Sequence, residues 1–408
     1  MYKYLLFFFY FSLFGNIDEM EVFLTRKEEK KTLYLSPIKI QNSELSSKYI
    51  NEITETLRFD LEHLEKILLL PKNVLEKQAS FFQIQPILQG NLLLFKIQTF
   101  SGNVEFPPIT LAGNIDEDRR TIHQTLDAFY QKYFHTKSIL TTKLLYTIRK
   151  KVGEKKWVSE IWSADFDGQN AKGVIQDEHY HLFPCAIPYS QEFLYVSFKT
   201  GTAKIYSSNS QEPYITLVGN QILPSITKDG SKVAFISDAA GRPDLFMLEK
   251  GNKPIQLYSY PRSTNASPCF DPTGKKIAFV SDKDGAPRIY VISVPDIFGK
   301  RPETFLISKK NRENTCPSWS SDGTKLAYSA KTEGIRQIWT YNFETGEEEQ
   351  LTLGRENKEN PTWSVDNSHI VYNTEENAEL YLLNSNTKKT EKLTKGPGHK
   401  RFAVWQTY

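Results

Sequence analysis

The stretch Pro317-Ser318-Trp319-Ser320-Ser321-Asp322-Gly323-Thr324-Lys325-Leu326-Ala327-Tyr328 decides the fold of this chain. Its Asp-Gly pair tolerates positive φ and is typical of a tight β-hairpin turn. The apolar run from Leu326 to Tyr328 is typical of a β-strand. We therefore expect a strand that starts at the proline, a tight turn and a second strand.

The same pattern occurs four more times in the C-terminal part of the chain. Successive prolines are 40, 44, 49 and 44 residues apart, and an aromatic residue follows each proline by eleven positions. The prolines are Pro184, Pro224, Pro268, Pro317 and Pro361, and the aromatics are Tyr195, Phe235, Phe279, Tyr328 and Tyr372. A repeat of about 40–45 residues with four short strand signals indicates a β-propeller blade, which buries its faces only by stacking on other blades.

We expect six blades, because the strands of a sixth are split between the two ends of the repeat region. Leu144 to Ile148 and Glu160 to Ser163 match the second and third strands of a blade, and Phe402 to Trp405 matches its missing first strand. A C-terminal strand in that place closes the ring and removes exposed edges. We expect no hydrolase domain after it, and no Gly-x-Ser-x-Gly motif occurs in the chain.

The N-terminal part does not repeat and divides into three predicted segments. Residues 1–15 hold one lysine and a short apolar run, which is typical of a signal peptide; a buried N-terminal strand is the alternative. Residues 16–30 are expected to be a mobile segment. Residues 31–137 predict a small α/β domain, with strands at 31–35 and 92–97 and helices at about 43–68 and 116–134. The fold class is thus an α/β domain followed by an all-β six-bladed propeller at 138–408.

Composition narrows the function classes. The chain has 408 residues, of which 39% are hydrophobic, and a net charge of +3 without a basic stripe. We therefore expect a soluble globular protein that does not bind nucleic acid. We also expect no cofactor, because the chain has neither a P-loop nor a Gly-x-Gly-x-x-Gly motif.

The candidate ligands for a metal are few. Cys185, Cys269 and Cys316 lie at or near the first-strand positions of their repeats, so we expect small packed residues and no disulfide. His179 and His181 fall on one side of a possible strand, but two imidazoles are weak evidence for a metal site. Asp282 to Gly285 is similar to half a calcium loop without the downstream Glu, and is better explained as a turn.

The combination of an export signal, a small α/β domain and a six-bladed propeller resembles the TolB family, the periplasmic propeller proteins of the Tol–Pal envelope-integrity and cell-division system. The junction between the two domains is the more specific signal. His123 and Asp127 match the family's His-x-x-x-Asp helix. Thr142 to Tyr146 resembles the strand that enters its first blade, and Asp165 to Asn170 the Asp-x-Asp-Gly-x-Asn turn after it. The chain departs from the pattern at Ser190-Gln191, where Asp-Gly is expected.

The resemblance implies two partner-binding regions. The first is a mobile N-terminal strand that binds a TolA-like inner-membrane protein by strand addition, here Glu21, Val22, Phe23, Leu24, Thr25 and Arg26; an ordinary edge strand is the alternative. The second is a propeller face that binds a Pal-like, peptidoglycan-associated lipoprotein, here Arg262, Thr264, Asn265, Arg312, Asn314, Thr315, Arg355 and Asn360. The alternative for the second region is that Asn and Thr merely form turns.

We therefore expect a periplasmic scaffold without enzymatic activity that reaches membranes only through its partners. One alternative is a secreted propeller that binds or cleaves a saccharide or peptide in its channel, with His179 and His181 as ligands. A purely structural propeller is another. A pull-down from envelope extract distinguishes these alternatives.

Overall fold

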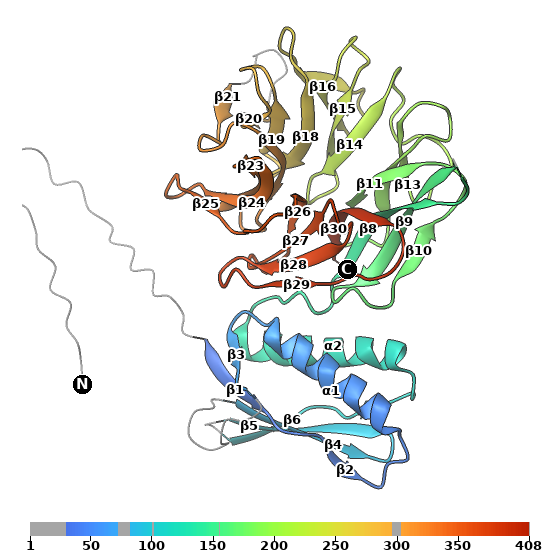
Figure 1. The fold of residues 1–408 in the computed structure, drawn as a ribbon, viewed down its shortest axis with the longest axis vertical. Coiled ribbons are helices and arrows are strands. Elements are labelled where there is room, and N and C mark those ends of the chain that lie inside the picture. The colour runs from blue at the N-terminus through green and yellow to red at the C-terminus, as the bar shows by residue number, and fades with distance from the viewer. Residues whose placement is uncertain (1–29, 72–81, 100–101, 155, 296–302, 408) are drawn as a thin grey trace, which may run out of the picture.

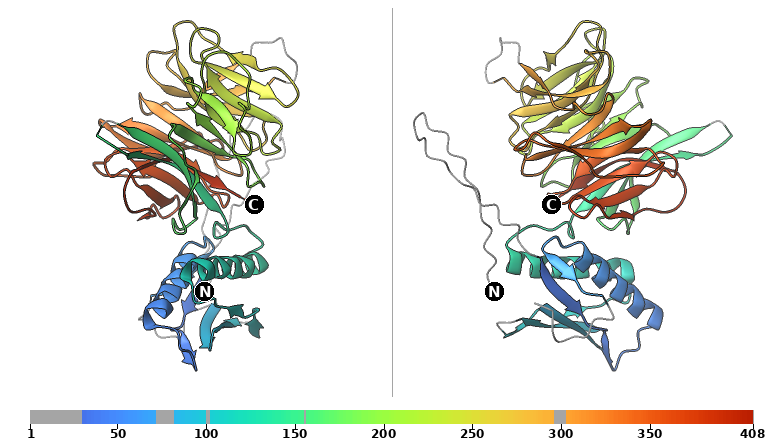
Figure 2. Two further views of the ribbon diagram at one scale, coloured as in Figure 1. Left: turned by 90° about the vertical axis from the view of Figure 1, so that its right-hand side faces the viewer. Right: turned by 60° about the vertical axis from the view of Figure 1, so that its left-hand side comes forward.

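A computed structural model shows two stacked domains and describes residues 30–71, 82–99, 102–154, 156–295, 303–407 (Figure 1). The smaller domain, in blue and teal, lies below the ring of blades. Both views in Figure 2 place it on one side of the propeller. The signal peptide at 1–15 and nearly all of the predicted mobile segment at 16–30 lie outside the described residues.

The N-terminal domain packs two helices on one mixed sheet. The sheet has the order β3-β1-β4-β5-β6, with β2 paired to β4 and β7 to β5. Its elements are β1 (Lys31–Leu35), β2 (Lys39–Gln41), α1 (Ser47–Glu62), β3 (Ile67–Leu69), β4 (Phe82–Gln89), β5 (Leu92–Thr99), β6 (Gly102–Glu105), β7 (Ile109–Thr110) and α2 (Ile115–Phe134). Figure 1 shows both helices between the sheet and the propeller.

Both predicted helices form, but the first is shorter than its apolar pattern suggests. Its buried stripe contains Ile53, Leu57 and Leu61, as expected. The helix stops at Glu62, and the chain re-enters the sheet as β3, which pairs in parallel with β1. The second helix starts where predicted, because the Asn114 side chain accepts a hydrogen bond from the Asp116 N–H at 3.1 Å.

The six-bladed propeller is confirmed. Blade 1 has the order β10-β9-β8-β30; blade 2 holds β11 to β13, and blades 3 to 6 hold β14 to β29, four strands each. The strands are β8 (Lys143–Lys151), β9 (Trp157–Asp165), β10 (Lys172–Ile175), β11 (His181–Ala186), β12 (Phe193–Ser197), β13 (Lys204–Ser207), β14 (Gln221–Ile226), β15 (Lys232–Ser237), β16 (Asp244–Glu249), β17 (Ile255–Tyr258), β18 (Asn265–Phe270), β19 (Lys276–Ser281), β20 (Arg288–Ser293), β21 (Thr304–Leu306), β22 (Asn314–Trp319), β23 (Lys325–Thr332), β24 (Ile335–Asn342), β25 (Glu348–Gln350), β26 (Lys358–Trp363), β27 (His369–Thr374), β28 (Leu380–Asn384), β29 (Thr390–Lys392) and β30 (His399–Gln406). Blade 2 has three strands, and an isolated β-bridge between Tyr206 and Pro213 lies where the other blades have a fourth strand.

The innermost strands correct one expectation, because each starts three residues before its proline and not at it. The pairing of the innermost strand with the second strand shifts register just before the proline. A β-bulge therefore separates the residues before the proline from those after it. The residue preceding the proline, or preceding Ala403 in β30, has positive φ in every blade: Phe183, Leu223, Ser267, Cys316, Asn360 and Phe402. A repeated bulge of this kind bends each innermost strand where it borders the channel.

The C-terminal strand closes the ring as predicted. β30 pairs antiparallel with β8, from His399 opposite Arg149 to Gln406 opposite Lys143. The Trp405 indole N–H donates to the Thr362 carbonyl of blade 6 at 3.0 Å. The Gln406 side chain donates to the Ser190 and Gln191 carbonyls of blade 2 at 3.2 and 3.0 Å. One strand therefore ties blade 1 to both of its neighbours.

Candidate protein interface

The propeller has two unlike faces. The N-terminal domain contacts the face that carries the Asp-Gly turns and the turns between third and fourth strands, for example through Arg119 and Asp167 at 2.8 Å. We call this the proximal face. The opposite face, here the distal face, carries the segments that lead into the innermost strands, chiefly residues 259–264, 308–313 and 353–357. The predicted Pal-binding residues lie on the distal face or immediately below it.

Four of these eight residues are exposed on the distal face: Arg262, Thr264, Arg312 and Arg355. Backbone geometry fixes two of them. Arg262 has φ of 58°, and the Thr264 N–H donates to Asp282 Oδ1 at 2.6 Å. Since the loop is held by its backbone, the Arg262 and Thr264 side chains are left free to face solvent.

Asn265 and Asn314 are buried, at 1% and 0% exposed, so their side chains do not reach the surface of the distal face. The Asn265 amide donates to the Pro243 carbonyl at 3.3 Å and to Asp244 at 3.1 Å. The Asn314 amide donates to the Asn311 carbonyl at 2.7 Å. Both side chains therefore position the loops above them.

Thr315 and Asn360 are half-buried and belong to a network that joins blades 5 and 6. The Cys316 thiol donates to Asn360 Oδ1 at 3.1 Å, and the Asn360 amide donates to Asn373 Oδ1 at 2.8 Å. Arg336 donates to Thr315 at 3.3 Å. These residues lie inside β22 and β26, and not in loops as the sequence suggested.

Arg336 organises this network and was missed by the sequence analysis. Its guanidinium forms ion pairs with Glu359 at 3.4 Å and with Glu313 at 3.7 Å. Burial, followed by the neighbouring negative charge of Glu375, raises the pKa of Glu359. Its position in the repeat was the only available signal, because Arg336 is the second residue of β24, the third strand of blade 5. In the structure it pairs with Glu359, just before Pro361.

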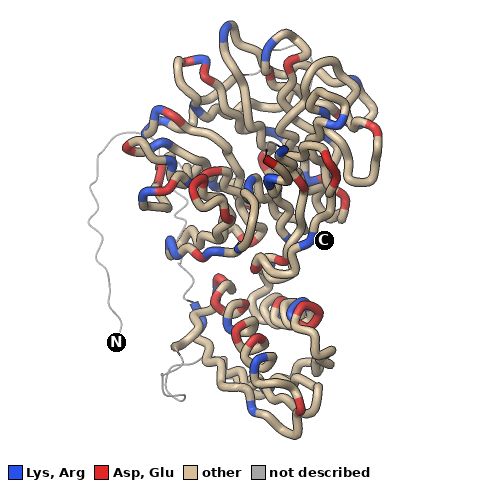
Figure 3. Tube along the Cα trace, turned by 45° about the vertical axis from the view of Figure 1, so that its right-hand side comes forward, with Lys and Arg blue, Asp and Glu red and all other residues tan. Residues whose placement is uncertain are grey.

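The distal face also presents isolated apolar side chains among its charges. Val218 is 72% exposed, Tyr260 38% and Leu353 80%. Each lies in a segment that leads into the next blade, and Figure 3 shows basic and acidic residues interspersed over the same domain. Exposed apolar residues mixed with arginine are typical of protein interfaces.

The channel holds a cavity of about 720 Å³ that opens toward the N-terminal domain. Innermost strands line it together with Gln124 and Gln131 of α2 and the connection at 137–142. The cysteines border it and are free, on innermost strands as expected, but half-buried. Burial raises the pKa of the Cys185 thiol to about 12 and that of Cys269 to about 11, so neither is a thiolate at neutral pH.

The two candidate histidines for a metal do not converge. The His181 ring is buried and its Nε2 lies 2.6 Å from Asp177 Oδ1, whereas His179 is exposed. Neither lines the channel cavity. The described part of the chain contains no group of three or more His, Cys, Asp or Glu that would hold a metal ion.

The domain junction is built around His123, which the sequence analysis singled out. Its Nδ1 lies 2.7 Å from Asp60 of α1, and its Nε2 lies 3.5 Å from Asp167 of blade 1. Burial alone would lower the pKa of His123, but the two carboxylates outweigh it and raise the pKa to about 9. The imidazolium therefore joins the two domains at neutral pH. Asp127 accepts from Ser138 at 2.6 Å and so fixes the interdomain connection.

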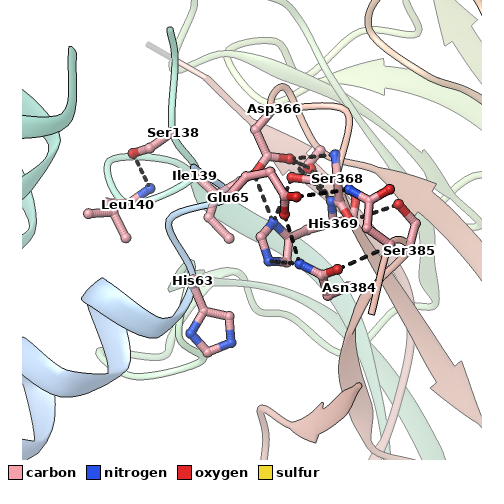
Figure 4. Close-up of polar contacts among 12 residues, drawn as sticks. His63, Glu65, Ser138, Ile139, Leu140, Asp366, Ser368, His369, Asn384 and Ser385 are labelled. Carbon is pink, nitrogen blue, oxygen red and sulfur yellow. Dashed lines mark hydrogen bonds and ion pairs between the residues drawn. The ribbon is translucent and has the colours of Figure 1, made fainter. Parts of the chain in front are cut away.

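A second polar cluster connects the end of α1 to blade 6 (Figure 4). Glu65 accepts hydrogen bonds from Asn384 at 3.1 Å and from Asn386 at 3.0 Å. His369 lies 2.7 Å from Asp366, and its ring centroid lies 5.7 Å from that of His63. Burial, followed by the charge of His369, lowers the pKa of His63 to about 4, so His63 is neutral.

Gly168 lies in the turn that carries Asp167 and has φ of +79°. A Cβ atom there would lie 2.2 Å from the Leu393 carbonyl oxygen. We expect Gly168→Ala to destabilise the protein by about 2–4 kcal/mol, from strained backbone plus overpacking. Gly230→Ala is the matched control, because Gly230 has φ of +70° with nothing within 4 Å, and we expect about 1 kcal/mol. Denaturant unfolding measures both; equal losses would contradict the close packing.

The N-terminal strand from Glu21 to Arg26 lies outside the described residues, so its predicted role stays a prediction. Among the residues that the structure does describe, none of the helices combines the length and the apolar character needed to cross a membrane.

Comparison with known proteins agrees with this architecture. The family model described as TolB beta propeller domain matches residues 130–408. A protein TolB homolog from Protochlamydia amoebophila is 38% identical and covers 84% of this chain and 82% of its own length. One from Chlamydia pneumoniae is 30% identical over 98% of this chain and 96% of its own.

A solved structure extends the likeness to both domains. The crystal structure of TolB from Acinetobacter baumannii superposes with a TM-score of 0.72, covers 93% of this chain and 97% of its own, and is 18% identical. At that identity the match concerns the fold alone. It covers the N-terminal domain as well as the blades.

Proposed function

The chain belongs to the TolB family of β-propeller proteins, and we propose that it is a periplasmic protein-binding scaffold of the Tol–Pal envelope system. The proposal rests chiefly on the distal face. Arginines and isolated apolar side chains are exposed there around the channel, on the side away from the N-terminal domain. A face of this composition suits the binding of another protein.

The distal face is the proposed site for a Pal-like lipoprotein. Its loops are fixed from below by buried amides, including those of Asn265 and Asn314. Such preorganisation reduces the entropy lost on binding. The ion-paired Arg336 holds the segments of blades 5 and 6 in register in the same way.

The second proposed partner is a TolA-like inner-membrane protein that pairs with Glu21 to Arg26. The support is the extended, apolar character of that segment and its position before β1. Together the two contacts would link the inner membrane to the peptidoglycan-bound outer membrane. Neither contact requires a reaction, and the raised pKa values of the channel thiols are consistent with a role without catalysis.

Leu353→Asp tests the proposed Pal-binding face. Because Leu353 is 80% exposed, we expect unfolding free energy to change by less than about 0.5 kcal/mol. Binding of the Pal-like domain should weaken at least about 10-fold, since a carboxylate replaces an apolar contact. Calorimetric titration measures this.

Val174→Asp is the control for Leu353→Asp, because Val174 is 36% exposed on the outermost strand of blade 1. Unchanged binding by Leu353→Asp would remove this face from the interface.

A chain without residues 21–26 should lose the TolA-like partner. If deletion left binding to both partners unchanged, the role proposed for the N-terminal strand would be wrong.

A further inference from the structure

Three exposed arginines on the distal face have no partner among the described residues. Arg262, Arg312 and Arg355 form no ion pair and no side-chain hydrogen bond with that part of the chain. They lie in the segments before β18, β22 and β26, so they span the three consecutive blades 4, 5 and 6. We call these residues the arginine arc.

The carboxylates close to the arc in sequence are already engaged. Glu313 pairs with Lys331 at 3.3 Å and with Arg336 at 3.7 Å. Asp282 accepts from the Thr264 N–H, and Glu356 from the Asn377 amide. None of these carboxylates forms an ion pair with an arginine of the arc, so within the described part of the chain the arc keeps three unpaired positive charges.

Two of the three arginines have an exposed apolar neighbour at the same place in the repeat. Tyr260 and Leu353 each lie eight residues before their blade's proline, and Arg262 and Arg355 each lie six before. The two apolar–Arg pairs thus occupy equivalent positions in blades 4 and 6. Arg312 lies in blade 5 between them. Arg312 lies five residues before Pro317, so only Arg262 and Arg355 share a repeat position.

From this arrangement we propose that the partner of the distal face presents an acidic segment, with carboxylates for the arginine arc and apolar side chains for Tyr260 and Leu353. This rests on the proposed function and names the chemistry of its partner. Arginine suits the role because its planar guanidinium binds a carboxylate through two parallel hydrogen bonds.

The face favours a protein over an anionic lipid surface. The hairpins next to the arc expose carboxylates of their own, at Asp284, Glu333, Glu375 and Glu376. A uniformly anionic membrane would be repelled by these hairpins. A folded protein, in contrast, can carry carboxylates opposite the arginines and none opposite the acidic hairpins. The mixture of charges on this face therefore favours a partner whose negative charges are placed opposite the arginines.

The test is a triple charge reversal, Arg262→Glu, Arg312→Glu and Arg355→Glu, titrated with the purified Pal-like periplasmic domain of the same cell. We expect binding to weaken at least about 30-fold. The matched control is Lys250→Glu, Lys253→Glu and Lys275→Glu, three exposed residues in turns of the proximal face. This control changes the net charge by the same amount as the reversal of the arginine arc, and it should alter the affinity by less than about twofold. Triple Arg→Lys should give an intermediate loss, because charge is kept and paired hydrogen bonding is not.

The outcomes separate this inference from the function on which it rests. If the wild-type protein binds and the reversed arc binds equally well, the acidic-partner inference fails and the scaffold function stands. If the proximal control weakens binding as much as the arc, net charge and not the arc is responsible, and the inference also fails. If the wild-type protein does not bind, the proposed function fails first. Arc-dependent binding to phosphatidylglycerol vesicles, with unchanged binding to the Pal-like domain, would make the ligand a lipid and overturn the proposal.

Discussion

A chain that ends at Gly398 is expected not to fold into a stable propeller. It lacks β30, which supplies the innermost strand of blade 1 and the contacts of that blade with blades 2 and 6. Without it, β8 exposes an unpaired edge to the channel and the ring is open. We expect loss of the cooperative thermal transition and aggregation on expression, measured by circular dichroism and size-exclusion chromatography.

A point variant in β30 tests the same closure of the ring with a smaller expected loss of stability. Trp405 is 8% exposed and donates to blade 6, so Trp405→Ala should cost about 3–4 kcal/mol of unfolding free energy. Trp157→Ala is the control, because Trp157 is half-buried at the edge of blade 1 beneath Arg149 and should cost about 1 kcal/mol. A folded, monomeric chain ending at Gly398 would show that β30 does not close the ring.

His123→Ala is expected to cost about 3–5 kcal/mol, because it leaves Asp60 and Asp167 buried without the cation between them. Chemical unfolding measures the loss. The double variant Asp60→Asn/His123→Ala should recover part of it, since Asp167 keeps Arg119 at 2.8 Å and only one buried carboxylate remains. If the single variant cost less than about 1 kcal/mol, the junction would not depend on this ion pair.

Because of His123, the free energy of unfolding is expected to fall as the pH rises above neutral. The pKa of His123 is about 9 when folded and about 6.5 when unfolded, so its stabilisation is complete below pH 6.5 and is lost as pH rises through 9. The difference corresponds to about 3 kcal/mol. Burial raises the pKa of Asp60 to about 6, which adds a smaller loss between pH 4 and 6. Wild-type stability should fall between pH 7 and 10 more steeply than that of His123→Ala; parallel curves would contradict the assignment.

The propeller was predictable because one spacing is repeated, with an aromatic eleven residues after each proline. The bulge before each proline was not, since Leu223 and Phe402 adopt a left-handed conformation that such residues rarely take alone. β4 was missed for a related reason, because Pro86 argues against a central strand. In the structure Pro86 lies between the part of β4 that pairs with β1 and the part that pairs with β2.

The candidate interface was predictable only in outline. Arg262, Arg312 and Arg355 are exposed where the repeat placed them. Asn265 and Asn314 are buried, because each strand begins before its proline and draws them into the blade. Arg336 contacts a neighbouring blade, and such a contact depends on how blades stack and not on the repeat within one blade.

The most direct test of the account is a calorimetric titration of the purified protein, without residues 1–15, with the purified Pal-like periplasmic domain of the same cell. A scaffold of the Tol–Pal system predicts saturable one-to-one binding with a Kd of about 10 µM or tighter. It also predicts at least about 30-fold weakening when the arginine arc is reversed. No detectable binding by the folded wild-type protein would contradict the proposed function.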